Sequence, residues 1–284
     1  MAAILLEGKV LASAIKERLA KDVEGLKKKG KTPKLVAIQV GENAASAVYL
    51  KSQSKNAEAL GIEYELITMD SETKEDELIK KIVSLNNDSR VNGIILQLPV
   101  PEHINARRVI CHINPAKDAE GMHPENLGRL VLAEAKVAPC TPLAVMELIK
   151  STNVNLYGKE VVVVGHSEIV GKPLSLLLLK EFATTTVCHI GTGQRGTLPD
   201  HVKRAEILIV AVGKASLIKG EWIKDGAIVI DVGVNKIGDK IVGDVEFETA
   251  KEKASFITPV PGGVGPLTVT MLMRNLVEAA KLQE

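Results

Sequence analysis

The chain has 284 residues, of which 45% are hydrophobic and 25% charged, a globular composition that excludes a mainly disordered protein. Lys and Arg number 36 and Asp and Glu number 35, and this balance argues against nucleic-acid binding. Aromatic residues make up only 2%, which favours an aliphatic core like that of covered parallel sheets. The three cysteines are widely spaced, and neither a membrane span nor a signal peptide is visible. We therefore expect a soluble, cytoplasmic protein.

The N-terminal half alternates between helical and strand-like segments. Apolar residues recur at helical spacing within the first thirty residues. Beyond them, strands are expected at 35–40, 63–68 and 93–98, and helices at 45–60 and 74–85. Strands separated by helices predict right-handed β-α-β units and a parallel sheet.

The C-terminal half repeats this pattern. A helix is expected at 143–150, with Thr141 as its N-cap and Pro142 in its first turn. The later elements are expected as strands at 160–164, 184–188, 207–212 and 227–232, a hairpin at 235–245 and a closing helix at 268–282. The sequence therefore predicts an α/β fold of two domains that meet near residue 138. Ligands of such folds bind at the carboxyl ends of strands and between domains.

The strand at 160–164 leads into a short turn that begins at Gly165 and ends at Gly171. Glycines and free amides at a helix start suit the phosphates of a dinucleotide, but the G-x-G-x-x-G pattern is absent. The turn alone supports a dinucleotide site and a plain strand-to-helix turn equally, and the later parallel strands favour the dinucleotide. The next strand ends without a carboxylate for a ribose hydroxyl, which argues against strict NAD use, and Arg195 could meet a 2′-phosphate.

Seven segments spread over nearly the whole chain carry a more specific signal. They are VGENAASAVY at 40–49, GIILQLPVP at 93–101, PAKDAEG at 115–121, PCTP at 139–142, VVVVGHSEIVGKP at 161–173, AIVIDVGVN at 227–235 and ITPVPGGVGPLT at 257–268. In this order they resemble the methylenetetrahydrofolate dehydrogenase/cyclohydrolases of folate metabolism.

The resemblance implies a fold and an activity. Residues 1–138, with the closing helix 268–284, would form a catalytic folate-binding domain, and residues 139–267 a Rossmann-like NAD(P)-binding domain, with the folate in a cleft between them. The enzyme would be a homodimer that transfers a hydride from methylenetetrahydrofolate to NADP, or alternatively to NAD. This step asks mainly for orientation of the two bound molecules, because the methenyl cation is stabilised by its own nitrogens.

The resemblance also implies site residues. Tyr49 would pack against the aminobenzoyl ring of the folate. The catalytic positions are Tyr49, Gln53, Gln97 and Glu120, and the other substrate-binding positions are Leu98, Pro99, Pro261, Gly262 and Gly263. The cofactor-binding positions are Gly165, His166, Ser167, Ile169, Gly171, Pro173, Ile190, Arg195, Val212, Gly213, Val234 and Thr268. No metal site is expected.

Two departures from the family concern the cyclohydrolase reaction. Gln53 stands where the family has its catalytic lysine. Lys51 and Lys55 each lie about 200° around the helix from Gln53, so neither should replace that lysine. The pterin-side aspartate is replaced by Glu120. Because a glutamine amide does not exchange a proton in the useful pH range, we expect weak or absent cyclohydrolase activity. The alternatives are a fully bifunctional enzyme and a catalytically silent folate or nucleotide binder.

Two further departures concern the cofactor. The family often has Arg after the first glycine of the turn and a polar or basic residue after the Cys-His pair. Here these positions are His166 and Ile190. These changes weaken the expected contacts with a 2′-phosphate. NAD therefore remains an alternative to NADP as the cofactor.

Overall fold

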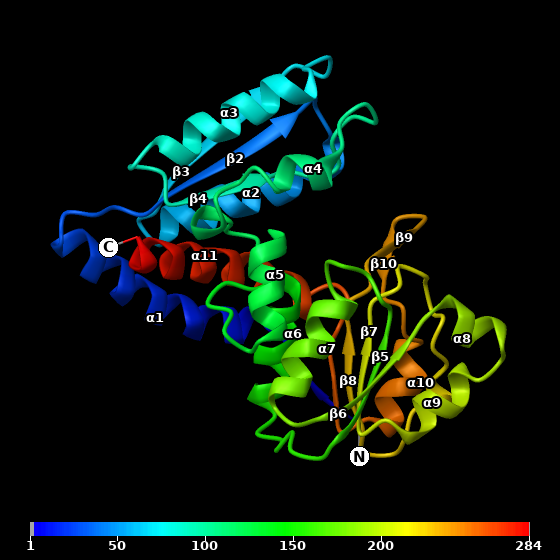
Figure 1. Cartoon of the computed structure of the whole chain (residues 1–284). Coiled ribbons are helices and arrows are strands. Elements are labelled where there is room, and N and C mark those ends of the chain that lie inside the picture. Colours follow the sequence, from blue (N-terminus) through cyan, green and yellow to red (C-terminus); the bar gives the residue numbers. More distant parts are fainter. Residues whose placement is uncertain (1–2, 284) are drawn as a thin grey trace. The chain divides into compact units, whose positions relative to one another are not determined.

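The computed structural model describes residues 3–283, without the side chains of residues 44 and 45, and divides them into two compact units. We call them the three-stranded unit (residues 14–140 and 269–283) and the six-stranded unit (residues 3–13 and 141–268). Each has one main parallel sheet with helices around it (Figure 1). The two-part α/β organisation with parallel sheets that the sequence predicts is confirmed.

The sheet of the three-stranded unit has the order β3-β2-β4, with both strand pairs parallel. Its strands are β2 (Lys34–Val40), β3 (Glu63–Met69) and β4 (Gly93–Leu96), and the helices that join them are α2 (Ala44–Ala59) and α3 (Glu75–Asn87). Leu78, Ile82 and Leu85 repeat at helical spacing on α3 and pack against one face of the sheet. Shorter elements follow: α4 (Ala106–Ile110), the 3-10 turn η1 (Pro115–Lys117) and α5 (Pro124–Val131).

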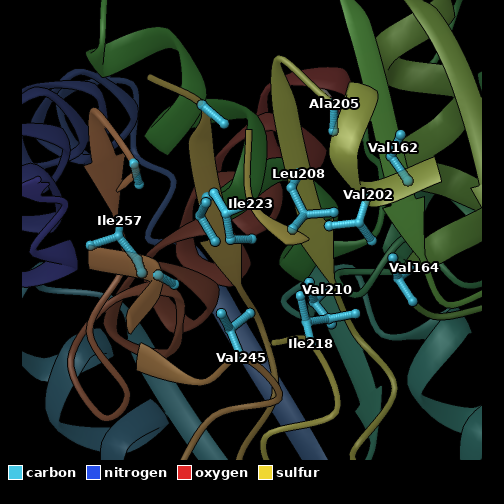
Figure 2. Close-up of a cluster of buried hydrophobic side chains, with 14 of the residues drawn as sticks. Val162, Val164, Val202, Ala205, Leu208, Val210, Ile218, Ile223, Val245 and Ile257 are labelled. Atoms are coloured by element: carbon cyan, nitrogen blue, oxygen red, sulfur yellow. The ribbon is translucent and has the colours of Figure 1, made fainter. Parts of the chain in front are cut away.

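The six-stranded unit has the order β1-β11-β8-β7-β5-β6, and every pair is parallel. The strands are β1 (Ile4–Leu5), β5 (Glu160–Val164), β6 (Thr184–Cys188), β7 (Ile207–Val210), β8 (Ile228–Asp231) and β11 (Phe256–Ile257). The remaining elements are α7 (Gly171–Lys180), α8 (Ile190–Gln194), α9 (Leu198–Arg204), the 3-10 turn η2 (Gly220–Trp222), the hairpin β9 (Asn235–Ile237) and β10 (Lys240–Val242), and α10 (Phe247–Lys253). Figure 2 shows its aliphatic core, in which Val162, Leu208 and Val202 come from β5, β7 and α9.

Three helices cross or meet the boundary between the units. They are α1 (Gly8–Lys28), α6 (Cys140–Ser151) and α11 (Val264–Leu282). Residues 3–13, which the sequence places in the N-terminal domain, fall in the six-stranded unit because β1 pairs with β11 and the Gly8 amide donates to the Gly262 carbonyl (2.9 Å). Two-residue strands with partners so distant in sequence leave no local pattern.

Two predicted helix starts are wrong by a few residues. Helix α6 begins at Cys140, so Thr141 lies inside the first turn instead of capping it. Helix α11 begins at Val264 instead of residue 268. Pro266 falls in its first turn, where the missing backbone N–H costs no helical hydrogen bond.

Candidate active site

The three-stranded unit has a switch point at the carboxyl ends of β2 and β4, because the chain passes from β2 to β3 on one side and then to β4 on the other. Helix α2 begins just after β2, and Gln97, Leu98 and Pro99 follow β4. The backbone N–H of Gln97 donates to the Ile38 carbonyl (2.8 Å), and the Ser46 hydroxyl donates to the Leu98 carbonyl (3.3 Å). Helix α2 and the loop after β4 are therefore fixed to each other. Leu98 and Pro99 are exposed and joined by a cis peptide bond.

Tyr49 and Gln53 lie one turn apart on α2. Gln53 is fully buried, and its Oε1 accepts a hydrogen bond from the Tyr64 hydroxyl on β3 (3.0 Å). Its Nε2 donates to Gln97 Oε1 at 3.5 Å, and Gln97 Nε2 donates in turn to the Leu98 carbonyl (3.0 Å). The result is a chain of neutral groups in which Gln53 has a fixed amide orientation. The neighbouring Lys51 and Lys55 are exposed.

Tyr64 was not singled out from the sequence. It is half-buried on a strand of exposed and half-buried residues, and its contact with Gln53 joins different elements. Burial raises the pKa of its phenol to about 12, so the hydroxyl remains a hydrogen-bond donor at neutral pH. Its place between Glu63 and Glu65 gives a short polar–apolar alternation, which does not identify Gln53 as its partner.

Buried charges stabilise the segment that carries Glu120. Lys117 Nζ donates to the carbonyls of Leu85, Asn86 and Asp88, at 3.2, 2.8 and 2.8 Å. The Asp118 carboxylate accepts hydrogen bonds from the amides of Gly121 (3.0 Å) and His123 (2.8 Å) and from Asn126 Nδ2 (2.9 Å). These contacts hold the loop that presents Glu120.

Glu120 and Tyr49 share an electrostatically unfavourable environment for negative charge. Burial raises the pKa of Glu120 to about 8, and the charge of Asp118 adds to the effect. Burial, Cys140 and Glu120 together raise the pKa of Tyr49 well above its ordinary value. The Cys140 thiol is also buried with a raised pKa, next to the Ala119 carbonyl (3.8 Å) and Asn275 Nδ2 (3.5 Å). At neutral pH the Glu120 carboxyl is mainly protonated, so it can donate as well as accept a hydrogen bond.

We expect Glu120→Gln to raise the melting temperature several times more at pH 8 than at pH 5. The carboxyl has a pKa of about 4.3 in an unfolded chain and about 8 in the folded protein. Between these values unfolding releases a proton, so the free energy of unfolding falls as pH rises. Glutamine removes this loss, which is on the order of 4 to 5 kcal/mol at pH 8 and about 1 kcal/mol at pH 5. Differential scanning fluorimetry at both pH values measures it. The exposed Glu125→Gln is the control, and an equal shift for Glu120→Gln at both pH values would contradict the expectation.

The six-stranded unit has its own switch point, between β5 and β7. Gly165 follows β5 with φ of +125°, and a Cβ there would lie 2.3 Å from the Ala211 carbonyl oxygen, so only glycine fits. In the turn that follows, the Ser167 hydroxyl accepts a hydrogen bond from the Val170 amide (3.1 Å). His166 is exposed, and its ring centroid lies 5.3 Å from that of His189, which follows β6. The sequence-predicted turn is thus a tight backbone cradle with exposed polar side chains.

Two buried aspartates hold the loops after β7 and β8. The Asp244 carboxylate accepts hydrogen bonds from the amides of Val212 (2.7 Å), Gly213 (2.9 Å) and Lys214 (2.8 Å). Asp231, at the end of β8, accepts from the amides of residues 233, 244 and 245 at 2.9, 3.0 and 2.8 Å. The Asp244 amide donates to the Asp231 carboxylate. Asp231 therefore fixes the backbone of Asp244, whose side chain in turn holds the loop after β7. Burial raises the pKa of Asp231 to about 6 against the opposing effect of its amide donors. This carboxylate pair was also missed from the sequence, because its partners lie on different loops.

The other predicted cofactor positions divide by exposure. Ile169, Ile190, Arg195, Val212, Gly213 and Val234 are exposed, whereas Gly171 and Pro173 are buried in the first turn of α7. Thr268 is half-buried, with its hydroxyl 3.5 Å from that of Thr141. Of the predicted substrate positions in this unit, Pro261 is exposed after a cis peptide bond, Gly262 is half-buried and Gly263 is buried. In the three-stranded unit, a hydrogen bond joins Gln53 to Gln97, and the charge of Glu120 acts on Tyr49.

Within residues 3–283, no helix is long and apolar enough to cross a membrane. No group of three or more His, Cys, Asp or Glu side chains in the same range could hold a metal ion.

Comparison with known proteins defines the family. Residues 6–120 match the model of the tetrahydrofolate dehydrogenase/cyclohydrolase catalytic domain, and residues 139–284 match that of its NAD(P)-binding domain. The bifunctional protein FolD of Bacillus subtilis (strain 168) is 51% identical over 282 residues, which cover 99% of each chain. The chain therefore belongs to the tetrahydrofolate dehydrogenase/cyclohydrolase family, whose members are NAD(P)-dependent enzymes.

Solved structures agree with this assignment. The bifunctional FolD methylenetetrahydrofolate dehydrogenase/cyclohydrolase of Campylobacter jejuni has a TM-score of 0.96 and 43% identity, with 100% of both chains covered. The Trypanosoma brucei enzyme, complexed with NADP and an inhibitor, has a TM-score of 0.93 and 37% identity, with 99% of this chain and 98% of that chain covered. The family resemblance, the fold class and the NAD(P)-binding domain predicted from the sequence are thus confirmed.

Proposed function

We propose that the protein is a methylenetetrahydrofolate dehydrogenase that uses NADP and has weak or absent cyclohydrolase activity. The observation that carries this proposal is Gln53, a buried neutral side chain in the position of the family's catalytic lysine, with both ends of its amide hydrogen-bonded. Hydride transfer needs no proton carrier at that position. Hydrolysis of the methenyl product does, because protons must move as water attacks the methenyl carbon.

The residues present fit a dinucleotide. The close approach of Gly165 to Ala211 leaves the turn without a side chain at the point where phosphates approach the backbone in such folds. The amides of Val212 and Gly213 are held by Asp244, which fixes the loop beside the turn. When NADP is bound, its nicotinamide supplies the hydride acceptor. The six-stranded unit contributes binding and orientation.

The three-stranded unit would contribute the substrate site. Tyr49 presents a protonated phenol and an aromatic face for the folate, and Glu120 presents a mainly protonated carboxyl for the polar edge of the pterin. Gln97 and the Leu98–Pro99 loop, fixed to α2, would position the methylene-bearing part of the substrate. Pro261, Gly262 and Gly263, which belong to the six-stranded unit, keep the substrate-binding role that the family resemblance implies. These groups orient the donor carbon for hydride transfer without a protein base.

Full bifunctionality is the second candidate. Its support is that relatives about half identical to this chain over its full length are bifunctional FolD proteins. The third candidate, a silent folate or nucleotide binder, has less support, because the cofactor turn and the folate-side loops are intact.

A paired assay on one preparation separates these candidates. Reduction of NADP with methylenetetrahydrofolate is followed by absorbance, and hydrolysis of methenyltetrahydrofolate is measured against the uncatalysed rate. We expect clear dehydrogenase turnover with hydrolysis at least 100-fold slower, the scale of a lost proton-transfer group. Comparable rates would establish the bifunctional enzyme, and no reduction with either nicotinamide cofactor would support the silent binder.

We also propose that the protein is a cytoplasmic homodimer. An exposed apolar group, in which the rings of Tyr157 and Phe182 lie 5.7 Å apart, borders the edge strand β6 and offers a surface for a second copy. Size-exclusion chromatography with light scattering at micromolar concentration tests the dimer, and a monomer mass under these conditions would exclude it.

A further inference from the structure

Tyr64 stands at the start of a line of three hydrogen bonds that leads to the candidate substrate site. Its hydroxyl lies 3.0 Å from Gln53 Oε1. Gln53 Nε2 lies 3.5 Å from Gln97 Oε1, and Gln97 Nε2 lies 3.0 Å from the Leu98 carbonyl oxygen. The line runs from β3, an edge strand of its sheet, through α2 to the loop after β4. A tyrosine that lies outside the predicted site residues is thus connected to two of them.

The direction of each hydrogen bond in this line is set by its last acceptor. A backbone carbonyl only accepts, so Gln97 must turn its NH2 group toward Leu98. Gln97 Oε1 then faces Gln53 and needs a donor, which is the Gln53 NH2 group. Gln53 Oε1 is left for Tyr64, whose hydroxyl must therefore donate. The phenol can donate at neutral pH, because burial raises its pKa to about 12.

Loss of the Tyr64 hydroxyl would disturb the rest of the line. Gln53 is fully buried, and a buried carbonyl oxygen that loses its donor costs at least as much free energy as the hydrogen bond contributed. The Gln53 amide would rotate to recover a partner. Its contact with Gln97 at 3.5 Å is the longest of the three, so it would be the first to break. Gln97 Oε1 would then lose the donor that holds it.

We propose that Tyr64 is a positioning residue of the dehydrogenase and acts on the folate through Gln53 and Gln97. Gln97 is half-buried whereas Gln53 is fully buried, so of the two amides Gln97 is the one that a bound folate can reach. While the line is intact, Gln97 presents its second N–H and the second lone pair of Oε1 in a fixed order. The proposal rests on the proposed substrate role of Gln97.

The experiment is a double-mutant cycle of Tyr64→Phe and Gln53→Met. Phenylalanine keeps the ring, so the variant should fold. We expect Tyr64→Phe to lower kcat/KM for methylenetetrahydrofolate about five- to tenfold, the scale of one hydrogen bond, and to leave KM for NADP within about twofold. Gln53→Met has no amide for the hydroxyl to hold, so in that background Tyr64→Phe should change kcat/KM by less than about twofold.

The cycle separates positioning from a general effect on the fold. The control Tyr157→Phe makes the same substitution on an exposed tyrosine of the six-stranded unit and should behave as the wild type. If Tyr64→Phe lowers the melting temperature but leaves kcat/KM for the folate within about twofold, Tyr64 has no positioning role. A loss that persists undiminished in the Gln53→Met background would also overturn the proposal, because Tyr64 would then act without Gln53.

A binding measurement keeps this proposal separate from the proposed reaction. Calorimetric titration with tetrahydrofolate needs no turnover. Tyr64→Phe should weaken tetrahydrofolate binding about fivefold, and it should have no such effect in the Gln53→Met background. This pattern in a protein that does not reduce NADP would support the role of Tyr64 and count against the proposed dehydrogenase. A wild-type protein that does not bind tetrahydrofolate would overturn both.

Discussion

Gln53→Lys is expected to raise the rate of methenyltetrahydrofolate hydrolysis at least tenfold, while the dehydrogenase kcat stays within about threefold of wild type. A positioned proton carrier contributes about 100- to 10,000-fold in general acid–base catalysis, and an introduced lysine should recover part of that. At this position the ammonium replaces an amide that already contacts Tyr64 and Gln97. Both partners have oxygens that can accept from the lysine, so the introduced charge is not left without hydrogen bonds.

Burial should adjust the new lysine for this role. Gln53 is fully buried, and desolvation lowers the pKa of a lysine toward the neutral range in which a proton carrier works best. The same desolvation should lower stability by about 1 to 3 kcal/mol, a fall of several degrees in melting temperature. Circular dichroism must therefore show a folded variant before its activity is interpreted.

Matched variants identify the cause of any gain. Gln53→Met has a similar size without a proton carrier and should not hydrolyse the methenyl substrate faster than wild type. Lys51→Gln removes an exposed lysine of the same helix and should change neither activity. A folded Gln53→Lys variant without increased hydrolysis would show that the proton carrier is not the missing component. Equal wild-type rates for both reactions would remove the premise.

Local sequence patterns predicted most of the regular structure. Apolar β-branched runs located the long strands of both sheets, and the helices expected between the first three strands agree with α2 and α3 to within two residues. Ligands of such folds bind at the carboxyl ends of parallel strands, and this rule also indicated the loops after β4 and β5, which carry predicted site residues. These signals lie within single elements, and for that reason one sequence was sufficient to find them.

The missed features depend on contacts between remote segments. Strands β1 and β11 have two residues each, and they exist because they pair with each other and with β8. Tyr64 contacts Gln53 from another element, and Asp244 binds amides that lie about thirty residues earlier in the chain. Hydrophobic periodicity does not encode such hydrogen bonds. The family resemblance identified position 53, but the structure supplied the partners that keep its amide in place.

Asp244→Asn is expected to raise KM for NADP at least tenfold and to lower the melting temperature by about 5 to 10 °C, on the order of 2 to 4 kcal/mol. The Asp244 carboxylate is fully buried and accepts hydrogen bonds from three successive amides of the loop after β7 and from Asn235 Nδ2 (2.8 Å). Asparagine has one acceptor oxygen, and its NH2 group would face backbone N–H donors. The loop should lose its fixed conformation, which carries the predicted cofactor positions Val212 and Gly213.

Two further variants decide whether the effect comes from this contact. In Gly233→Ala, the new Cβ would lie 2.1 Å from Asp244 Cγ, so it should displace the carboxylate and reproduce the Asn phenotype. Glu206→Gln removes a carboxylate that accepts hydrogen bonds from the Glu160 amide (3.0 Å) and from Lys159 (2.7 Å). Glu206 directly precedes β7, so it lies at the amino ends of the strands, away from the loop after β7. This variant should lower stability without changing KM for NADP. Kinetics and NADPH fluorescence titration measure the cofactor effect, and KM for the folate should stay within about twofold. If Asp244→Asn lowers stability only as Glu206→Gln does, with cofactor affinity unchanged, then Asp244 supports the fold and does not position the cofactor loop.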